Sequence, residues 1–389
     1  MKTTLTKLLV LVIVLLVPTA SLFAQGVPQE SLASFLEIEQ YNRAIHIMAM
    51  LLIGFGFLMV FIKKYGRSAL TATFLLVSIS LPLYFLIHTS GLFSEHGSEV
   101  EELILAEFAA ASLLIAAGAV LGRLKMYQYI ILGLLFVPFY MFNEWIIVEN
   151  GFGILQSGVA DTGGSIVIHA YGALFGLGVA MSMTTKKELE EPIEADATSD
   201  IYSILGSMVL WVFWPSFCAA LVPLEAIPHT VVNVFFALCG STLITYIASI
   251  SIRCKINAAD IANAALAGGV AIGSTCDHAS HGGALVIGLI AGAVSTIGFA
   301  IIQAKQQKMI KIVDTCGVTN LHGIPGILGG FAAMIVVSGL NTADQLSGIF
   351  ITIVSSLIFG FLSGKIISIF GHRKVAYVDA EEFMDAEDD

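Results

Sequence analysis

Long apolar stretches alternate with short polar connections along almost the whole chain. After residue 43, eleven stretches are long enough to cross the hydrocarbon core of a bilayer, which takes about 20 helical residues. The alternation therefore predicts an all-α polytopic membrane protein with eleven transmembrane helices. Their expected ranges are 44–62, 69–91, 101–122, 127–148, 163–184, 202–223, 230–252, 257–275, 283–303, 317–339 and 347–369.

The first residues follow the order of a secretory signal peptide. Lys2 and Lys7 precede an apolar run from Leu8 to Val17, and small residues follow up to Ala24. A positive region, a short apolar core and a small-residue site in this order predict a signal peptide over 1–24 that is cleaved after Ala24. The alternative is an uncleaved first membrane helix. Cleavage would leave the mature amino terminus outside.

Basic residues mark one side of the membrane. Lys and Arg gather in every second connection and after the last expected helix, and Arg43 is the exception on the other side. Because positive residues accumulate on the cytoplasmic side, this distribution predicts an N-out, C-in topology. The residues that carry it are Lys63, Lys64, Arg67, Arg123, Lys125, Lys186, Lys187, Arg253, Lys255, Lys305, Lys308, Lys311, Arg373 and Lys374.

Composition supports the same class of protein. Hydrophobic residues make up 57% of the chain and charged residues 12%, whereas a soluble domain has about 25% charged residues. Water-soluble enzymes are therefore excluded, and a net charge of -11 without a basic face argues against nucleic acid as a partner. The five Cys residues are odd in number and lack CxxC spacing, so neither a disulfide framework nor a zinc site is predicted.

One sequence pattern, D-T-x-G-x4-H-x6-G, occurs twice, beginning at Asp161 and at Asp314. The predicted topology lets the first copy enter from outside and the second from inside, five helices later. Two halves in opposite orientation are typical of inverted-repeat transporters, whose substrate path lies near the midplane. The pattern predicts a 5+5 inverted repeat with halves at 44–184 and 202–339, plus one extra carboxyl-terminal helix at 347–369.

The membrane domain is expected over residues 25–371, followed by an acidic cytoplasmic tail over 372–389. A second acidic run follows the fifth expected helix, from Glu188 to Asp200. Acidic residues contribute little to topology, so both runs are interpreted as solvated faces or as flexible segments that bind a cytoplasmic protein partner.

The repeat places two histidines near the middle of the membrane. Eight helical residues span about 12 Å, so His169 and His322 approach the centre of a core about 30 Å thick from opposite faces. Ionisable groups inside spans usually face a cavity, although a histidine bonded across helices is the structural alternative. Facing imidazoles could share one hydrogen and offer their other nitrogens to a small polar molecule. Burial favours the neutral form of both rings, which suits a neutral substrate.

Metal binding is the rival use of paired histidines. It would need carboxylate or thiolate ligands at the same depth, and the span around His169 holds none. Cys276, Asp277, His278 and His281 look more like ligands, but they lie in an external connection where a polar turn is the simpler interpretation. We therefore expect no metal and no cofactor.

Three acidic residues have positions that suggest a role. Asp161 and Asp314 stand at helix N-cap positions, and capping the first turn is a sufficient reason for both. Asp161 lies on the outer side and could also shape an external vestibule. Glu144, toward the outer end of the fourth expected helix, is placed to attract a cation.

Three segments carry a resemblance to a known family: residues 314–330 (DTCGVTNLHGIPGILGG), 161–176 (DTGGSIVIHAYGALFG) and 211–217 (WVFWPSF). The first two resemble the two His segments, and the third the sixth-helix motif, of the Rh glycoproteins, the Rh branch of the ammonium transporter superfamily. The likeness extends through 54–65 and 263–273, and hence through nearly all of the mature chain.

The resemblance implies an ammonia-conducting homotrimer with one pore per subunit. The family's twin histidines, which line the middle of a narrow hydrophobic pore, map onto His169 and His322. Two stacked Phe residues close the outer mouth of such pores and map onto Phe108 and Phe217, an external gate. The family's buried Asp maps onto Asp161.

Cys218 departs from the family pattern, because an Asn is expected after the sixth-helix motif. The WFGFNxGS motif of the ammonium transporter branch is also absent, which argues against that branch's external cation site. Trp145 lies near the place where that branch has a cation-binding Trp, but its Asn-Glu context favours the Rh branch.

The expected function is transport, not enzymatic catalysis. Ammonium, or its analogue methylammonium, would lose its proton in a vestibule containing Asp161 and Glu144, and neutral ammonia would pass the external gate and the histidines. A carbon dioxide channel is the second hypothesis, and a membrane sensor or scaffold that acts through its acidic cytoplasmic segments is the third. A metalloenzyme is the weakest. We expect the protein to lie in the lipid bilayer of a cell membrane, and the predicted signal peptide favours the bacterial inner membrane.

Overall fold

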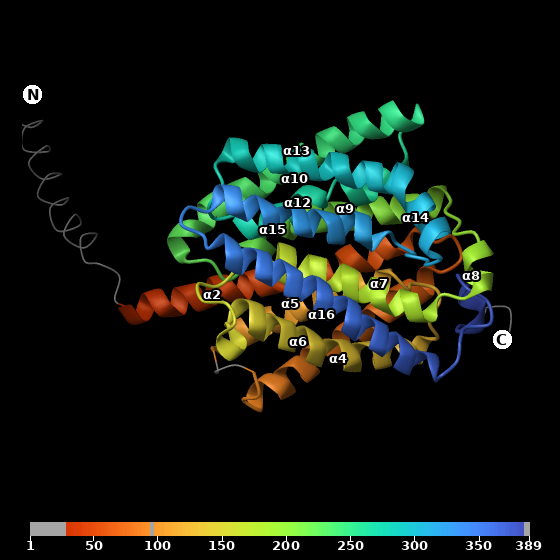
Figure 1. Cartoon of the computed structure of the whole chain (residues 1–389), viewed down its shortest axis with the longest axis horizontal. Coiled ribbons are helices and arrows are strands. Elements are labelled where there is room, and N and C mark those ends of the chain that lie inside the picture. Colours follow the sequence, from red (N-terminus) through yellow and green to blue (C-terminus); the bar gives the residue numbers. More distant parts are fainter. Residues whose placement is uncertain (1–28, 94–96, 385–389) are drawn as a thin grey trace, which may run out of the picture.

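Long helices lie roughly side by side along one direction in the computed structural model, which describes residues 29–93 and 97–384 (Figure 1). All regular elements within these residues are helices. Nine of the described helices are long and apolar enough to cross a membrane. The predicted all-α, multi-pass class is therefore confirmed. The signal peptide predicted for residues 1–24 lies outside the described residues.

The first half of the chain is helical at each of the five positions expected there. The long helices are α2 (Gln29–Ala49), which continues through η1 (Met50–Phe55), α3 (Gly56–Leu58) and η2 (Met59–Phe61), then α4 (Gly66–Thr89), α5 (Glu99–Gly118), α6 (Met126–Val148), and η4 (Ser165–Ala170), which continues into α7 (Tyr171–Met183). The connections contain η3 (Gly151–Gly153) and α8 (Lys186–Glu190).

The second half is helical at its expected positions as well. The helices are α9 (Ala197–Cys218), η5 (Leu224–Ala226) with α10 (Ile227–Arg253), α11 (Ala258–Ala264), α12 (Ala267–Ile272) with η6 (Gly273–Thr275), α13 (His281–Ile297) with η7 (Gly298–Ile302) and α14 (Gln303–Ile310), η8 (Thr319–Gly323) with α15 (Ile324–Val336), and α16 (Thr342–Ser368). A last short helix, η9 (Asp379–Glu381), follows.

Three of the helical positions differ from the expectation. The first helix begins at Gln29, well before the expected residue 44, because a helix satisfies its own backbone and can continue beyond the apolar core. α5 carries Glu99, Glu101, Glu102 and Glu107, and the segment from α11 to η6 is interrupted after Ala264. Neither of these two is among the nine described helices that meet the length and apolarity expected of a span.

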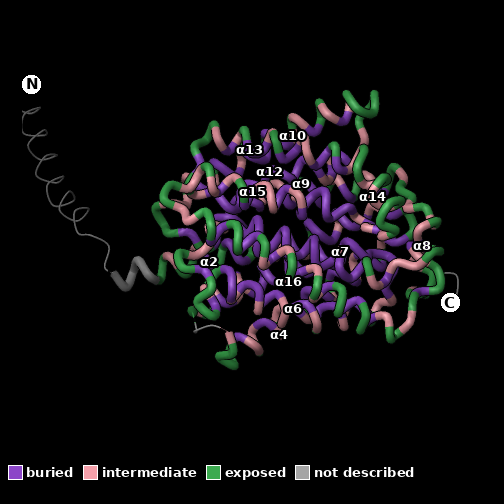
Figure 2. The backbone as a smooth tube through the Cα atoms, in the orientation of Figure 1, coloured by how far each residue is buried: buried purple, intermediate pink, exposed green. Residues whose placement is uncertain are grey.

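Each of the two histidine-bearing segments packs against a helix from the other half of the chain. η4 packs against α15, and η8 packs against α7. A Cβ at Gly326 would lie only 2.3 Å from the carbonyl oxygen of Ser165, so this crossing requires a glycine. Figure 2 shows that the helices enclose a continuous buried interior, with exposed residues at the periphery and at both ends.

The two ends of the bundle are distinct. α2 begins at the left of Figure 1, which we call the outer end, and α8 and the last described residues lie at the right, which we call the inner end. The names follow the predicted topology.

The described part of the predicted acidic tail is packed against the inner end. Both carboxylate oxygens of Asp379 accept backbone N–H groups, from Arg67 (3.1 Å) and Ser68 (2.8 Å), at the start of α4. The backbone N–H of Tyr377 donates to the carbonyl of Gly122 at 3.0 Å. Tyr377 and Asp379 are therefore anchored to the end of the bundle, while Glu381 and Glu382 are exposed to solvent.

Candidate functional site

Both copies of the repeated pattern fold in the same way. Gly164 and Gly317 have φ angles of +74° and +66°, left-handed conformations that favour glycine. The π-helical turns η4 and η8 follow, and they contain His169 and His322. Such turns often occur at functional sites, because the wider turn displaces side chains from the α-helical pattern. The two histidines therefore occupy equivalent places in equivalent segments.

A carboxylate caps each of these turns. Asp161 accepts hydrogen bonds from the backbone N–H groups of Ile166 (3.0 Å) and Val167 (2.8 Å). Asp314 accepts the N–H groups four and five residues after it, both at 3.0 Å. Burial raises the pKa of Asp161 to about 6, although its hydrogen bonds act in the opposite direction, and burial also raises the pKa of Asp314. The two carboxylates therefore satisfy N–H groups at the start of each turn, but the N-cap positions predicted for them are occupied by Gly164 and Val318.

The structure brings His169 and His322 together in the interior. Their Nδ1 atoms are 3.3 Å apart, and their nearly parallel rings have centres 5.3 Å apart at an angle of 13°. The side chains are almost fully buried, with 2% and 3% of their surface exposed. One Nδ1 must carry the hydrogen and the other must accept it. In the described part of the chain, Nε2 of His169 has no hydrogen-bond partner, so it is available to a small molecule.

Aromatic side chains cover the outer side of this pair. Phe108 of α5 and Phe217 of α9 have ring centres 4.6 Å apart at an angle of 49°. The Phe217 ring lies 6.1 Å from His169, and the Trp214 ring stacks on His169 at 5.4 Å. Trp214 and Phe217 are three residues apart on α9 and so share one face of the helix. The two Phe residues thus lie between His169 and the outer end.

A cavity of about 400 Å³ opens on the other side of Phe108. Phe108, Glu144 and Asp161 all line it, so three of the predicted site residues share one space. We call it the outer cavity. The Glu144 carboxylate accepts hydrogen bonds from the hydroxyls of Tyr84 (2.8 Å) and Tyr140 (3.0 Å) and is mostly buried. Asp314 is not part of this group, because it caps the other histidine-bearing turn.

A second, more acidic space adjoins the outer cavity. It measures about 540 Å³ and shares Leu105, Glu149 and Leu221 with the lining of the outer cavity. His88 and Glu102 also line it, with an Nδ1–Oε1 distance of 3.3 Å. Carboxylates concentrated in a recess create a negative potential, and this attracts cations.

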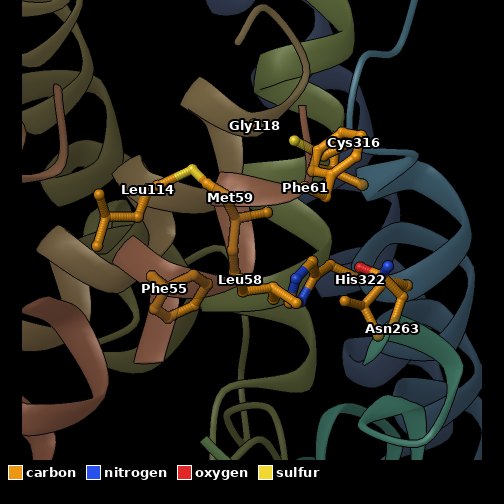
Figure 3. A pocket seen from close by; sticks show the side chains of 12 residues that line it. Phe55, Leu58, Met59, Phe61, Leu114, Gly118, Asn263, Cys316 and His322 are labelled. Carbon is orange, nitrogen blue, oxygen red and sulfur yellow. The ribbon is translucent and has the colours of Figure 1, made fainter. Parts of the chain in front are cut away.

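The inner side of the histidine pair is narrow and mainly apolar. A cavity of about 30 Å³ reaches His322, and Phe55, Leu58, Leu114 and Asn263 are among its lining residues (Figure 3). The Phe55 ring lies nearly parallel to the His322 ring, with centres 6.3 Å apart. We call this space the inner cavity. Asn263 is its main polar side chain beside His322, so little stabilises an ion there.

The external ligand-like cluster does not converge on one point. His278 pairs with Asp277 at 2.9 Å, Cys276 donates its thiol to the carbonyl of Gly273, and His281 faces Asn233. Among the described residues, no group of three or more His, Cys, Asp and Glu side chains could hold a metal ion.

Sequence reasoning missed several residues that support the site. The Ser274 hydroxyl donates to Asp161 at 2.5 Å, and Tyr84 and Tyr140 hold Glu144. Tyr140 stands four residues before Glu144 on α6, and this helical spacing could have revealed the pair. Ser274 and Tyr84 come from other segments and carry no such signal.

Comparisons with known proteins agree with this geometry. The model of the Ammonium Transporter Family matches residues 6–386. The ammonium transporter Rh type A of Bos taurus is 36% identical over 363 residues, which cover 88% of this chain and 83% of the relative. The human ammonium transporter Rh type B is 36% identical over 360 residues, which cover 83% and 77%.

Solved structures give the same answer. The Nitrosomonas europaea Rh50 structure, described as one of the Rhesus protein family of channels, matches with a TM-score of 0.88 and 51% identity over 91% of this chain and 95% of that one. A sensor Amt protein shares the fold, with a TM-score of 0.77 and 19% identity over 88% and 95%. The chain therefore belongs to the ammonium transporter family, and within it to the Rh branch.

Proposed function

We propose that the protein is an ammonium transport channel in which ammonium loses its proton near the outer end and neutral ammonia passes along His169 and His322. One observation carries the proposal: the paired imidazoles lie buried between the outer cavity and the inner cavity. The names of the Rh relatives, which are ammonium transporters, support the choice of substrate.

The cost of moving an ion favours transport of the neutral form. A charge taken from water into an apolar interior costs several kcal/mol even after relaxation, and the inner cavity has little to offset this. Glu144 and Asp161 can hold ammonium in the outer cavity until it gives up its proton. Potassium has no proton to lose, so it is rejected without a size filter.

Ammonia can then move between polar positions on an apolar path. It is both a donor and an acceptor, and Nε2 of His169 offers it a hydrogen-bonding partner that the protein leaves unused. Phe108 and Phe217 must separate for each passage, because their rings are only 4.6 Å apart. Side-chain rotations of this kind take place in picoseconds to nanoseconds at exposed sites and more slowly in packed ones. The Phe pair therefore acts as a gate.

We also propose eleven membrane crossings, an N-out, C-in topology and a homotrimer with one pore per subunit, in the bacterial inner membrane. α5 and the broken segment from α11 to η6 would be the two further crossings, which is consistent with their buried apolar faces. The alternating basic connections support the topology. The homotrimer rests on the resemblance to the Rh branch.

Flux measurements test the role of the histidines. The double variant His169→Leu/His322→Leu, reconstituted in vesicles, should lose methylammonium uptake and retain its oligomeric state on size-exclusion chromatography. His372→Leu changes an exposed histidine at the inner end and serves as the matched control, with unchanged uptake expected. Normal uptake by a folded double variant would refute the proposed path.

Internal pH separates the two candidate substrates in the same vesicles. Ammonia that enters binds a proton and makes the interior more alkaline, whereas carbon dioxide that enters makes it more acidic. A stopped-flow record with an internal pH dye should show rapid alkalinisation after an ammonium jump. If the protein accelerates only the acidification that follows a carbon dioxide jump, the gas-channel hypothesis is favoured instead.

A further inference from the structure

Two histidine rings lie close together, at an angle to each other, away from the proposed conduction path and near the outer ends of α10 and α13. His229 is near the start of α10, and His281 is the first residue of α13. Their ring centres are 5.1 Å apart, with 39° between the ring planes. His229 is half-buried and His281 is exposed, so solvent reaches the pair. Neither ring lines the outer or the inner cavity.

A buried asparagine, Asn233, orients the His281 ring. The side-chain nitrogen of Asn233 donates to the carbonyl oxygens of Cys276 (2.9 Å) and Ala279 (2.7 Å), which fixes the orientation of its amide. Its Oδ1 then faces Nδ1 of His281 at 2.7 Å. An amide oxygen can only accept, so Nδ1 of His281 carries the hydrogen. The Nε2 of His281 is left with a free lone pair.

The other ring is fixed in the same manner. Nε2 of His229 lies 2.8 Å from the carbonyl oxygen of Ala279 and 3.0 Å from the side-chain nitrogen of Asn233. Both hydrogens of that amide are donated to the carbonyls of Cys276 and Ala279, so Nε2 carries its own hydrogen and donates it to the Ala279 oxygen. Nδ1 of His229 is left with a free lone pair. Within the described residues, neither free nitrogen takes part in a hydrogen bond that would explain it. Metal-binding histidines usually have this arrangement, in which one ring nitrogen donates to a carbonyl or amide and the other binds the ion.

We propose that His229 and His281 form a binding site for one divalent transition-metal ion, with water completing its coordination. Two imidazoles that bind one tetrahedral zinc ion at about 2.0–2.1 Å have ring centres roughly 5 Å apart, as these two have. Neutral imidazole nitrogens favour zinc, copper and nickel over calcium and magnesium. A bound ion would tie α10 to α13 at their outer ends.

Zinc titration of the full-length protein without a histidine tag tests the site. Calorimetry of metal-free protein should detect one Zn²⁺ per chain that is absent from His229→Gln and from His281→Gln. His278→Gln is the matched control, because His278 is an exposed histidine of the same connection and should keep the site. Unchanged binding in both His→Gln variants, or loss of binding in the control, would overturn the proposal.

Two further measurements keep the test independent of any one variant. Asn233→Leu keeps both histidines and removes the acceptor that fixes the tautomer of His281, so it should weaken zinc binding about 10- to 100-fold. In the unaltered protein, bound Zn²⁺ should protect His281 from diethyl pyrocarbonate, as followed by mass spectrometry. Equal modification with and without saturating Zn²⁺ would contradict the site even if the variants fail to fold.

Discussion

The two copies of the repeated pattern share a backbone arrangement and differ in their surroundings. Asp161 and Asp314 both cap a π-helical turn that carries a histidine. Asp161 takes a further hydrogen bond from Ser274 and lines the outer cavity of about 400 Å³. Beside Asp314, the buried guanidinium of Arg123 holds the Thr315 hydroxyl at 3.2 Å instead. The inner cavity nearby measures about 30 Å³.

The comparison distinguishes the features that position the two histidines from the features that determine which molecules can reach them. The shared features, the caps and the left-handed glycines, place His169 and His322 against each other. The differing features determine what can reach each ring, with a wide acidic space on one side and a narrow apolar one on the other. The repeat therefore provides a symmetric frame, and its surroundings make the two entrances unequal.

The largest expected effect comes from the shared frame, at the last glycine of each copy. A Cβ at Gly176 would lie 2.5 Å from the carbonyl oxygen of Ala116, and one at Gly329 would lie 2.4 Å from that of Ala271. Gly176→Ala and Gly329→Ala should each destabilise the protein by about 3 kcal/mol, at the upper end of overpacking effects. Thermal unfolding in detergent should show similar decreases for the two variants.

Gly282→Ala is the control for these substitutions, because no atom lies within 4 Å of the Cβ position at Gly282. Its unfolding temperature should stay close to that of the wild type. A large decrease for one of Gly176→Ala and Gly329→Ala and none for the other would show that the frame is not symmetric in energy.

The next effect distinguishes the two caps. Asp161→Ala and Asp314→Ala each remove a carboxylate that accepts N–H groups at the start of a turn, a loss like that of an N-cap, which costs about 0.5–2 kcal/mol. Asp161→Ala also leaves the buried hydroxyl of Ser274 without its acceptor, and a lost hydrogen bond to a charged group costs about 1.5–3 kcal/mol. Denaturation of both variants in detergent should therefore rank Asp161→Ala as the less stable. The opposite order would mean that the contacts around Asp314 matter more than Ser274.

The sequence predicted the features that repetition and hydropathy encode. Twice-repeated Asp, Gly and His at fixed spacing predicted two equivalent segments, and the apolar stretches predicted where the helices lie. The π-helical form of the turns around His169 and His322 was not predictable, because apolar periodicity does not specify a shift from four-residue to five-residue hydrogen bonds.

Contacts between residues that are far apart in the sequence were also not predictable. Ser274 is 113 residues from Asp161, and Tyr84 is 60 residues from its partner Glu144 and lies on another helix. Hydropathy marks only the part of a helix that enters the membrane, so the start of the first helix was placed too late. The proximity of Phe108 and Phe217 was expected only from the resemblance to a family, since aromatic residues in apolar helices carry no position-specific signal.

The smallest expected effect is on the hydrogen bond between Ser274 and Asp161, which is found in the first copy of the repeated pattern. The Ser274 hydroxyl donates to the ionised form of Asp161 and so lowers the pKa of that carboxyl, which burial raises to about 6. Ser274→Ala removes this donor, so the pKa of Asp161 should rise by roughly one to two units, the equivalent of one hydrogen bond to a charged group.

The carboxyl stretching band in infrared difference spectra measures this change, and Asp161→Asn identifies the band by its loss. Below its pKa the carboxyl is protonated, so in Ser274→Ala the band of the neutral form should persist to higher pH than in the wild type. Ser280→Ala, which removes a hydroxyl that caps α13 in the same connection, should leave the band at its wild-type pH. An unshifted band in Ser274→Ala would mean that the backbone N–H groups alone set the ionisation of Asp161, and the two copies would then differ only in the space around them.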